Sequence, residues 1–328
     1  MNTDEALTRS VEHPRSVTDN TRLMKIIHAA NDLGNGSRKV CLAIGVFDGV
    51  HLGHQQIIRQ TVSDARQHDG LALVVTFDRH PSFIVAPSRV PPLIFSRPQK
   101  LRAIEALGAE ALLEIPFDRP FSEKSGDTFV RELVRDLHSI FSICVGADFV
   151  FGHKRSGNVA LLQSLGAVLN FKVHGHAAVE LDGELVSSTR IREAIRTGAL
   201  DDASQMLGRP YALAGRVLTG DKIGRQLGFP TANLDVTGLI LPPNGVYAGR
   251  ATVDGKVFRV ALNIGVRPTI TAQPQLRVEA HLLDFTGDLY GRELEVELGE
   301  KLRDEKKFSS AADLREQIGR DVAAARNS

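Results

Sequence analysis

Apolar and polar positions follow two different patterns along this chain, and the change comes near residue 205. Before it, short apolar runs alternate with longer amphipathic segments, which predicts strands that alternate with helices. This α/β order favours a doubly wound parallel sheet that binds ligands at the carboxyl ends of its strands. Strands are expected at 24–27, 40–44, 71–76, 111–115 and 142–145, and helices from 55 onward and at 96–107, 127–137 and 187–197.

Beyond the change, strands and turn residues replace the helices. The expected elements are strands at 211–218, 245–253, 256–264, 276–283 and 293–298 and a final helix at 310–325. Asp254-Gly255 is typical of a hairpin turn, as is Asp182-Gly183 in the first half. The pattern predicts a small antiparallel β-barrel with a C-terminal helix. We therefore expect a disordered extension at 1–21, an α/β domain at 22–203 and a barrel domain at 204–328.

Length and charge narrow the classes of function. A chain of 328 residues is long enough for two domains, and a net charge of +1 gives no support for nucleic-acid binding. No apolar run approaches the length of a membrane span, and residues 1–21 are unlike a secretion signal, so we expect a cytoplasmic protein without a membrane partner. Cys41 and Cys144 lie in apolar runs and are expected as buried thiols, with no disulfide.

Residues 43–54 contain the strongest candidate chemistry. Gly45 and Gly49 follow an apolar run and allow a sharp turn, and His51 and His54 come next, in the first turn of the following helix. Side chains three residues apart share a helix face, and the N–H groups of a helix N-terminus attract phosphate. This arrangement predicts nucleotidyl transfer, which needs positioning and hydrogen-bond donors more than a protein nucleophile.

Metal binding is one alternative for the two histidines. Zinc would need further ligands at suitable spacing, and only His80 and Cys41 are candidates. Ordinary surface histidines are the other alternative, although the glycines and the strand–turn–helix context favour phosphate. His80 follows a strand and is suited to contact flavin or phosphate, or to be a loop residue with no such role.

A second candidate phosphate site lies at residues 187–192. Ser188 and Thr189 supply hydroxyl groups at the start of a helix, and Arg192 lies one turn into it. Taken alone, this segment is more typical of a helix cap with solvated arginines. Asp148 follows another strand and suits ribose or flavin, or a turn. Lys154 and Arg155 come after it and could reach phosphates, or remain exposed loop cations.

In the barrel half, residues 220–233 form a loop rich in glycine and basic residues, which can surround phosphates. Its spacing differs from the common Gly-x4-Gly-Lys loop, and its candidate nucleotide ligands are Gly220, Lys222, Gly224 and Gly228. Thr231 and Asn233 offer neutral oxygens to Mg²⁺, although both are also typical turn residues. Glu279 lies in an alternating strand, where a solvated carboxylate is the ordinary expectation.

Several motifs together resemble one known family. They are Gly-x-Phe-Asp-Gly-Val-His-x-Gly-His at 45–54, Gly-x-Asp-Phe-x-Phe-Gly at 146–152, Ser-Ser-Thr-x-Ile-Arg at 187–192 and Gly-Phe-Pro-Thr-Ala-Asn at 228–233. Further matching segments lie at 263–269, 279–285 and 302–308. The chain thus resembles the bacterial bifunctional riboflavin kinase/FMN adenylyltransferases, also called FAD synthetases, over residues 22–326. The first motif is similar to that of the wider HxGH nucleotidyltransferase group.

The resemblance implies a Rossmann-like domain that joins FMN to AMP from ATP, giving FAD and pyrophosphate, and a barrel that phosphorylates riboflavin to FMN. Its implied substrates are the small molecules riboflavin, FMN and ATP, with Mg²⁺ as cofactor. It implies that His51, His54 and Arg192 handle phosphates and that Glu279 is the base for the riboflavin hydroxyl. The implied nucleotide contacts of the first domain are Gly45, Phe47, Gly53, Ser188 and Thr189. Flavin contacts are implied at Asp148 and Arg267, and magnesium ligands at Thr231 and Asn233.

Two departures from the family pattern leave rival hypotheses open. Arg79 stands where proline is common, and Val150 stands where arginine is frequent. A kinase whose first domain has lost activity is one rival, and the presence of both histidines and Arg192 argues against it. A flavin-binding or sensing protein without turnover is the other. It would need neither a base nor magnesium ligands, so the presence of those residues argues against it.

Overall fold

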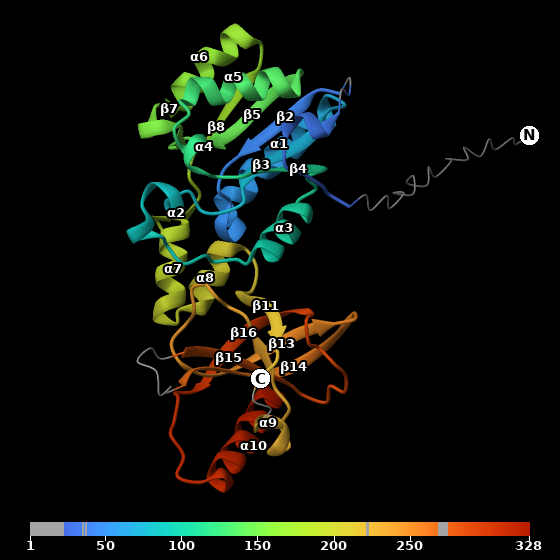
Figure 1. Ribbon diagram of the computed structural model, residues 1–328, viewed down its shortest axis with the longest axis vertical. Helices are drawn as coiled ribbons and strands as arrows, with labels where there is room; N and C mark the ends of the chain where they lie inside the picture. The colour runs from blue at the N-terminus through green and yellow to red at the C-terminus, as the bar shows by residue number, and fades with distance from the viewer. Residues whose placement is uncertain (1–22, 35, 37, 221–222, 268–274) are drawn as a thin grey trace, which may run out of the picture.

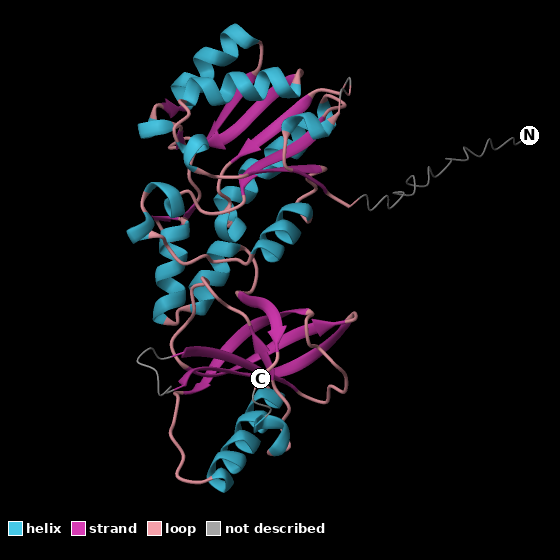
Figure 2. Ribbon diagram, viewed as in Figure 1, coloured by secondary structure: helices cyan, strands magenta, loops and turns pink. Residues whose placement is uncertain are grey.

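The computed structural model describes residues 23–34, 36, 38–220, 223–267 and 275–328. It consists of a parallel sheet covered by helices and a β-barrel, which lie one above the other in Figure 1. Figure 2 shows most helices around the parallel sheet, whereas strands dominate the barrel half. The extension expected at 1–21 and the candidate ligand Lys222 lie outside the described residues.

The first half contains a six-stranded parallel sheet with strand order β1-β4-β3-β2-β5-β8. Its strands are β1 (Lys25–Ile27), β2 (Val40–Ile44), β3 (Leu71–Phe77), β4 (Ala111–Ile115), β5 (Ile140–Gly146) and β8 (Lys172–His176). Both faces are buried, because one hydrophobic cluster contains side chains of α1 (Leu52–Gln67) and α3 (Arg97–Glu105). The other cluster contains side chains of α5 (Gly126–Leu137) and α6 (Val159–Leu169). The expectation of a doubly wound sheet is confirmed.

Shorter elements connect the main strands and helices. They include η1 (Ala30–Leu33), η2 (Asp48–Val50), α2 (Ser82–Val85), η3 (Pro87–Arg89), α4 (Arg119–Ser122), β6 (Val150–Phe151), η4 (His153–Arg155), β7 (Gly157–Asn158), β9 (Glu180–Leu181) and β10 (Glu184–Leu185). Several helices begin at capping residues, as α3 does at Ser96, whose hydroxyl accepts from the Gln99 amide. Ser187 caps α7 (Ser188–Thr197) in the same way through the Arg190 amide.

The second half is a closed barrel with strand order β11-β12-β15-β14-β13-β16. The strands are β11 (Ala212–Leu218), β12 (Ala232–Leu234), β13 (Gly245–Val253), β14 (Lys256–Arg267), β15 (Gln275–Leu282) and β16 (Glu293–Arg303). A short helix, α9 (Ile223–Gln226), precedes β12, and α10 (Ala311–Asn327) ends the chain against the barrel. Arg303 fixes α10 by donating to both carboxylate oxygens of Asp321, at 2.7 and 2.9 Å. The predicted barrel and C-terminal helix are confirmed.

The two halves are joined by α7 and α8 (Leu200–Leu207) and contact each other directly. The Gln99 amide donates to the Ala212 carbonyl at 3.0 Å, and Arg102 forms ion pairs with Glu293 and Glu295 of the barrel. The expected boundary between residues 203 and 204 falls inside α8 and remains a prediction. No helix in the described parts of the chain is long and apolar enough to cross a bilayer.

Candidate active sites

The turn after β2 has an unusual backbone that its sequence explains. Phe47 is completely buried with a φ of 53°, and Gly49 has a φ of 77°, a conformation that glycine adopts without strain. A β-carbon on Gly45 would lie 3.0 Å from the Phe47 ring. Gly45 therefore makes room for the ring, and the buried ring fixes the turn that leads into α1.

His51 and His54 lie together at the start of α1. Their rings stack with centroids 3.6 Å apart, and Phe47 contacts the His54 ring edge-on at 5.3 Å. Burial, followed by the charge of Arg192, lowers the pKa of His51 to about 4, and burial also holds the pKa of His54 well below its ordinary value. Both rings are therefore neutral near pH 7. Their buried Nδ1 atoms have no hydrogen-bond partner among the described residues, which suits an arriving ligand.

Arg192 approaches the same turn from α7. Its guanidinium donates to a carboxylate oxygen of Asp48 at 2.5 Å and to the Pro92 carbonyl at 2.6 Å. The Ser188 hydroxyl, at the start of α7, donates to the Asp48 carbonyl at 3.1 Å. Two helix N-termini that are far apart in the sequence thus meet at one turn.

Asp48 connects this turn to a third segment and was not assigned a role from the sequence. Its buried carboxylate accepts from Arg192 and from the backbone amides of Ile94 and Phe95, at 3.0 and 3.2 Å. A buried charge of this kind needs several such partners to offset its lost hydration. An acidic residue within a buried glycine turn is the sequence signal that could have identified it.

The other candidate residues of the parallel-sheet half have fewer contacts with this turn. Thr189 is exposed, and Gly53 is close enough to His51 that a β-carbon would lie 3.3 Å from its ring. His80 accepts from the Ser82 amide at 3.2 Å, and burial followed by Arg192 lowers its pKa. Arg79, at the first departure from the family pattern, is paired with its neighbour Asp78.

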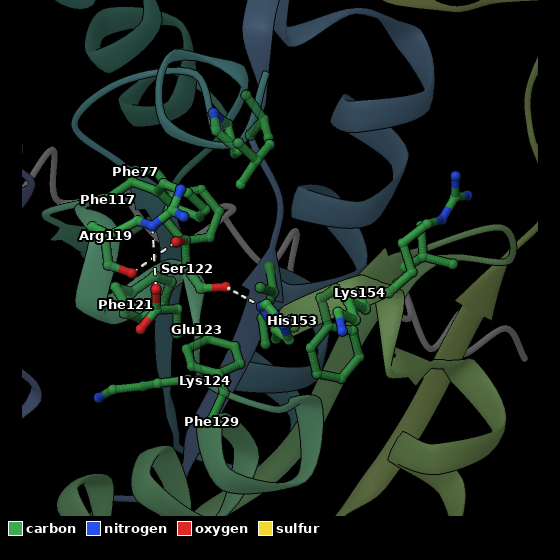
Figure 3. Close-up of a pocket in the computed structure, with 18 of the residues that line it drawn as sticks. Phe77, Phe117, Arg119, Phe121, Ser122, Glu123, Lys124, Phe129, His153 and Lys154 are labelled. Atoms are coloured by element: carbon green, nitrogen blue, oxygen red, sulfur yellow. Dashed lines mark hydrogen bonds and ion pairs between the residues drawn. The ribbon is translucent and has the colours of Figure 1, made fainter. Parts of the chain in front are cut away.

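A pocket of about 500 Å³ opens beside the turn, at the carboxyl ends of β2 and β3 (Figure 3). Six phenylalanines contribute to its wall. Phe77 contacts Phe117 and Phe121 at centroid distances of 5.2 and 5.8 Å, and Phe149 stacks on Phe151 at 5.2 Å. The cations of the lining are Arg119, Lys124, Lys154 and Arg155. The pocket therefore suits a flat aromatic ligand that carries negative charge.

The pocket lining differs from the flavin contacts that the sequence predicted. Val150, at the second departure from the family pattern, lines the pocket, whereas the exposed Asp148 does not. Sequence reasoning did not single out Phe117 and Phe121. The His153 ring contacts the Ser122 carbonyl at 3.2 Å and links two segments of the wall, as Figure 3 shows.

In the barrel, strand register brings three polar side chains into one row. Glu279 of β15 is the Cα partner of Asn233 in β12 on one side and of Asn263 in β14 on the other. Cross-strand partners share a face of the sheet. All three line a pocket of about 330 Å³ that is closed on one side by Leu314 and Ile318 of α10.

Thr231 lies where this pocket meets a second one, of about 460 Å³, and lines both. The neighbouring glycines permit close approach, because a β-carbon on Gly220 would lie 2.3 Å from the Asn233 amide nitrogen. A β-carbon on Gly224 would lie 3.2 Å from the Thr231 hydroxyl. Gly228 has a φ of 92° and turns the chain toward Phe229. Arg267 ends β14, and its side chain is outside the described part of the structure.

The described structure also bears on the metal alternative and on the two cysteines. Among the described residues, no group of three His, Cys, Asp or Glu side chains is placed to hold a metal ion. Cys41 and Cys144 are buried free thiols in β2 and β5, as expected, and burial raises the pKa of Cys144 to about 12.

These features define the class of protein: a parallel-sheet nucleotidyltransferase with paired histidines, joined to a barrel with its own polar site. Comparison with known proteins identifies the family. The FAD synthetase family model matches residues 35–190, and the riboflavin kinase model matches residues 207–328. The chain therefore belongs to the bifunctional riboflavin kinase/FMN adenylyltransferase family, which confirms the resemblance seen in the sequence.

Named relatives are similar in sequence to this chain over nearly its whole length. The bifunctional riboflavin kinase/FMN adenylyltransferase of Haemophilus influenzae is 38% identical, over 93% of this chain and 98% of that protein. The protein of the same name in Escherichia coli K12 is 35% identical, over 92% and 97%. A crystal structure described as the macrolide-efflux protein of Streptococcus pneumoniae is 28% identical, with a TM-score of 0.78 over 93% of this chain and 99% of that one.

The lowered pKa of His51 predicts a pH dependence of stability. The unfolded chain takes up this proton near pH 6.5 and the folded chain only near pH 4, so the free energy of unfolding falls as pH drops between these values. We expect a His51→Asn variant to lose part of this dependence in urea unfolding measured across that range. His138→Asn, at an exposed residue, is the control. Equal pH dependence in His51→Asn and the parent would contradict the prediction.

Proposed function

We propose that this chain phosphorylates riboflavin to FMN in its barrel and then joins FMN to AMP from ATP in its parallel-sheet domain, giving FAD. The observation that carries the proposal is that each half has its own polar cluster beside its own pocket. We place the division between the two activities near residues 203 and 204, as the sequence pattern predicts.

For the kinase step, the pocket beneath α10 accepts the flavin ring, because its apolar wall includes Phe229, Leu314 and Ile318. The pocket on the other side of Thr231 and the loop at 220–228 take ATP. Glu279 accepts the proton of the ribityl hydroxyl as its oxygen bonds to the γ-phosphorus. The bond between that phosphorus and the β–γ bridging oxygen breaks, and ADP leaves.

Mg²⁺ fits this site as an ion that arrives with the nucleotide. Thr231 and Asn233 would hold it through neutral oxygens, and Mg²⁺ commonly keeps waters and phosphate oxygens as its other ligands. A cluster of carboxylates is therefore not required. The close approach of Gly220 to Asn233 leaves the backbone next to that side chain. When bound, the ion neutralises charge on the phosphates.

For the adenylyl step, the aromatic pocket beside β2 and β3 holds the FMN ring, and the cations in its lining attract the phosphate. An oxygen of that phosphate attacks the α-phosphorus of ATP, the α–β bridging bond breaks, and pyrophosphate leaves. The neutral rings of His51 and His54 each carry one N–H that can donate to phosphate oxygens, and Arg192 adds a positive charge.

The remaining predicted contacts complete the proposal. For the nucleotide of the adenylyl step they are Gly53, Ser188 and Thr189, and for flavin they are Asp148 and Arg267. Gly45 and Phe47 act by shaping the turn rather than by touching a ligand, because Phe47 is completely buried. Ser188 is already placed at that turn.

A direct assay tests the proposal. Purified protein is incubated with riboflavin and Mg-ATP, and the flavins are separated by chromatography over time. We expect FMN to appear first and FAD to follow, with one pyrophosphate released for each FAD. FMN that accumulates without FAD would indicate a kinase alone, and riboflavin that binds but is never converted would indicate a sensing protein.

A further inference from the structure

Arg209 reaches from the start of the barrel half to the turn that precedes the paired histidines. Its guanidinium donates to the carbonyl of Gly49 at 3.1 Å and to that of Val50 at 2.5 Å, and it lies over the Phe95 ring at 5.1 Å. Arg209 belongs to the stretch matched by the riboflavin kinase family model and lies outside the FAD synthetase match. Its hydrogen bonds therefore hold a turn that lies in the stretch matched by the FAD synthetase model.

Neighbours of Arg209 fix the same turn. The buried Gln55 side chain donates to the Val50 carbonyl at 3.0 Å and to the Leu207 carbonyl at 2.7 Å. Gly208 lies so close to α1 that a β-carbon there would be 2.7 Å from the Leu52 side chain. The junction is therefore packed directly against the first turn of α1.

Holding the Arg209 guanidinium in this environment costs free energy. This cost argues that the contacts have a role. Burial lowers the pKa of Arg209, and its Nε atom is buried without a hydrogen-bond partner among the described residues. Glu295 contributes a favourable charge, but within the described chain no carboxylate lies close enough to form an ion pair with Arg209. A half-buried guanidinium held mainly by carbonyls and an aromatic ring is tolerated where its geometry is needed.

We infer that Arg209 is a positioning residue for adenylyl transfer, supplied by the kinase half of the chain. It acts on the carbonyls of Gly49 and Val50 from one side, while Asp48 anchors the turn to Arg192 from the other. His51 follows Val50 directly, so displacement of these carbonyls displaces the histidine pair. This inference rests on the proposed adenylyltransferase activity.

The test uses the full-length chain with Arg209→Ala and a matched variant, Arg102→Ala. Arg102 also joins the two halves, through ion pairs with Glu293 and Glu295, but neither ion pair involves the turn before the histidines. We expect Arg209→Ala to lower kcat for FAD formation from FMN by roughly 10²-fold, because small displacements of reacting groups cost about that much. Riboflavin phosphorylation should stay at the parent rate. Millimolar guanidinium chloride, compared with sodium chloride, should restore part of the lost activity.

The outcomes separate the inference from the function on which it rests. No FAD from the parent chain would overturn both. FAD formation at the parent rate in Arg209→Ala, an equal loss in Arg102→Ala, or a loss that guanidinium does not relieve would overturn the inference alone. If Arg209→Ala does not fold, as judged by circular dichroism and kinase activity, Arg209→Lys decides. A folded Lys variant should lose FAD formation selectively, and parent activity in it would overturn the inference.

Discussion

Replacing Glu279 by Gln is expected to stop FMN formation while leaving the conversion of supplied FMN to FAD intact. Glutamine keeps the shape of the side chain in the row between Asn233 and Asn263 but cannot accept the hydroxyl proton. Loss of a general base typically costs roughly 10²- to 10⁴-fold in rate. Chromatographic assays with riboflavin and with FMN as separate substrates measure the two steps in one preparation.

A second glutamate provides the matched control for this variant. Glu297 lies on β16 of the same barrel, is exposed and is the Cα partner of Arg250. Glu297→Gln removes a strand carboxylate of the same type away from the polar row, and its kinase activity should be that of the parent. Kinase turnover near the parent rate in Glu279→Gln would show that the base lies elsewhere.

The sequence predicted best those parts of the fold that depend on local pattern. The apolar run at 40–44, the two glycines and the histidine pair lie as expected in β2, the turn and α1. The helices expected from residues 96, 187 and 310 are present, and each begins at a capping serine. These features are short-range consequences of periodicity and capping, so one segment is enough to identify them.

Elements with weak periodicity were missed. The helix α6 packs on the sheet through Leu162 and Leu165, but apolar Val168 is exposed, so its apolar positions form no clear stripe. The strand β8, Lys-Val-His-Gly-His, carries polar residues at the edge of the sheet and shows no apolar run. The short strand β12 carries Asn233, which was read as a loop residue, and only pairing with β11 and β15 defines it.

Site features that join distant segments could not be predicted either. The carboxylate of Asp48 meets Arg192 across 144 sequence positions, and Arg209 meets Gly49 across 160. Neither contact leaves a periodic signal in one sequence. The motifs predict residues that handle phosphate, and the fold shows which contacts hold those residues in place.

A loss of FAD formation without loss of kinase activity is the result expected for His54→Ala. His54 belongs to the first half, and its ring stacks on His51 and meets the edge of Phe47. Its removal takes away a donor to the developing charge, which typically costs on the order of 10²- to 10³-fold in rate. Assays with FMN and Mg-ATP measure this loss, and riboflavin phosphorylation by the same preparation reports on folding.

His68→Ala is the control that separates chemistry from packing in this experiment. His68 lies at the other end of α1, where its ring contacts Phe141 at a centroid distance of 4.0 Å. The two variants remove the same kind of side chain from the two ends of one helix. Only the His54 end adjoins the turn between β2 and α1. FAD formation should therefore survive in His68→Ala and be lost in His54→Ala. Similar losses in both folded variants would mean that the losses come from disturbed packing of α1. The histidine pair would then have no chemical role in adenylyl transfer.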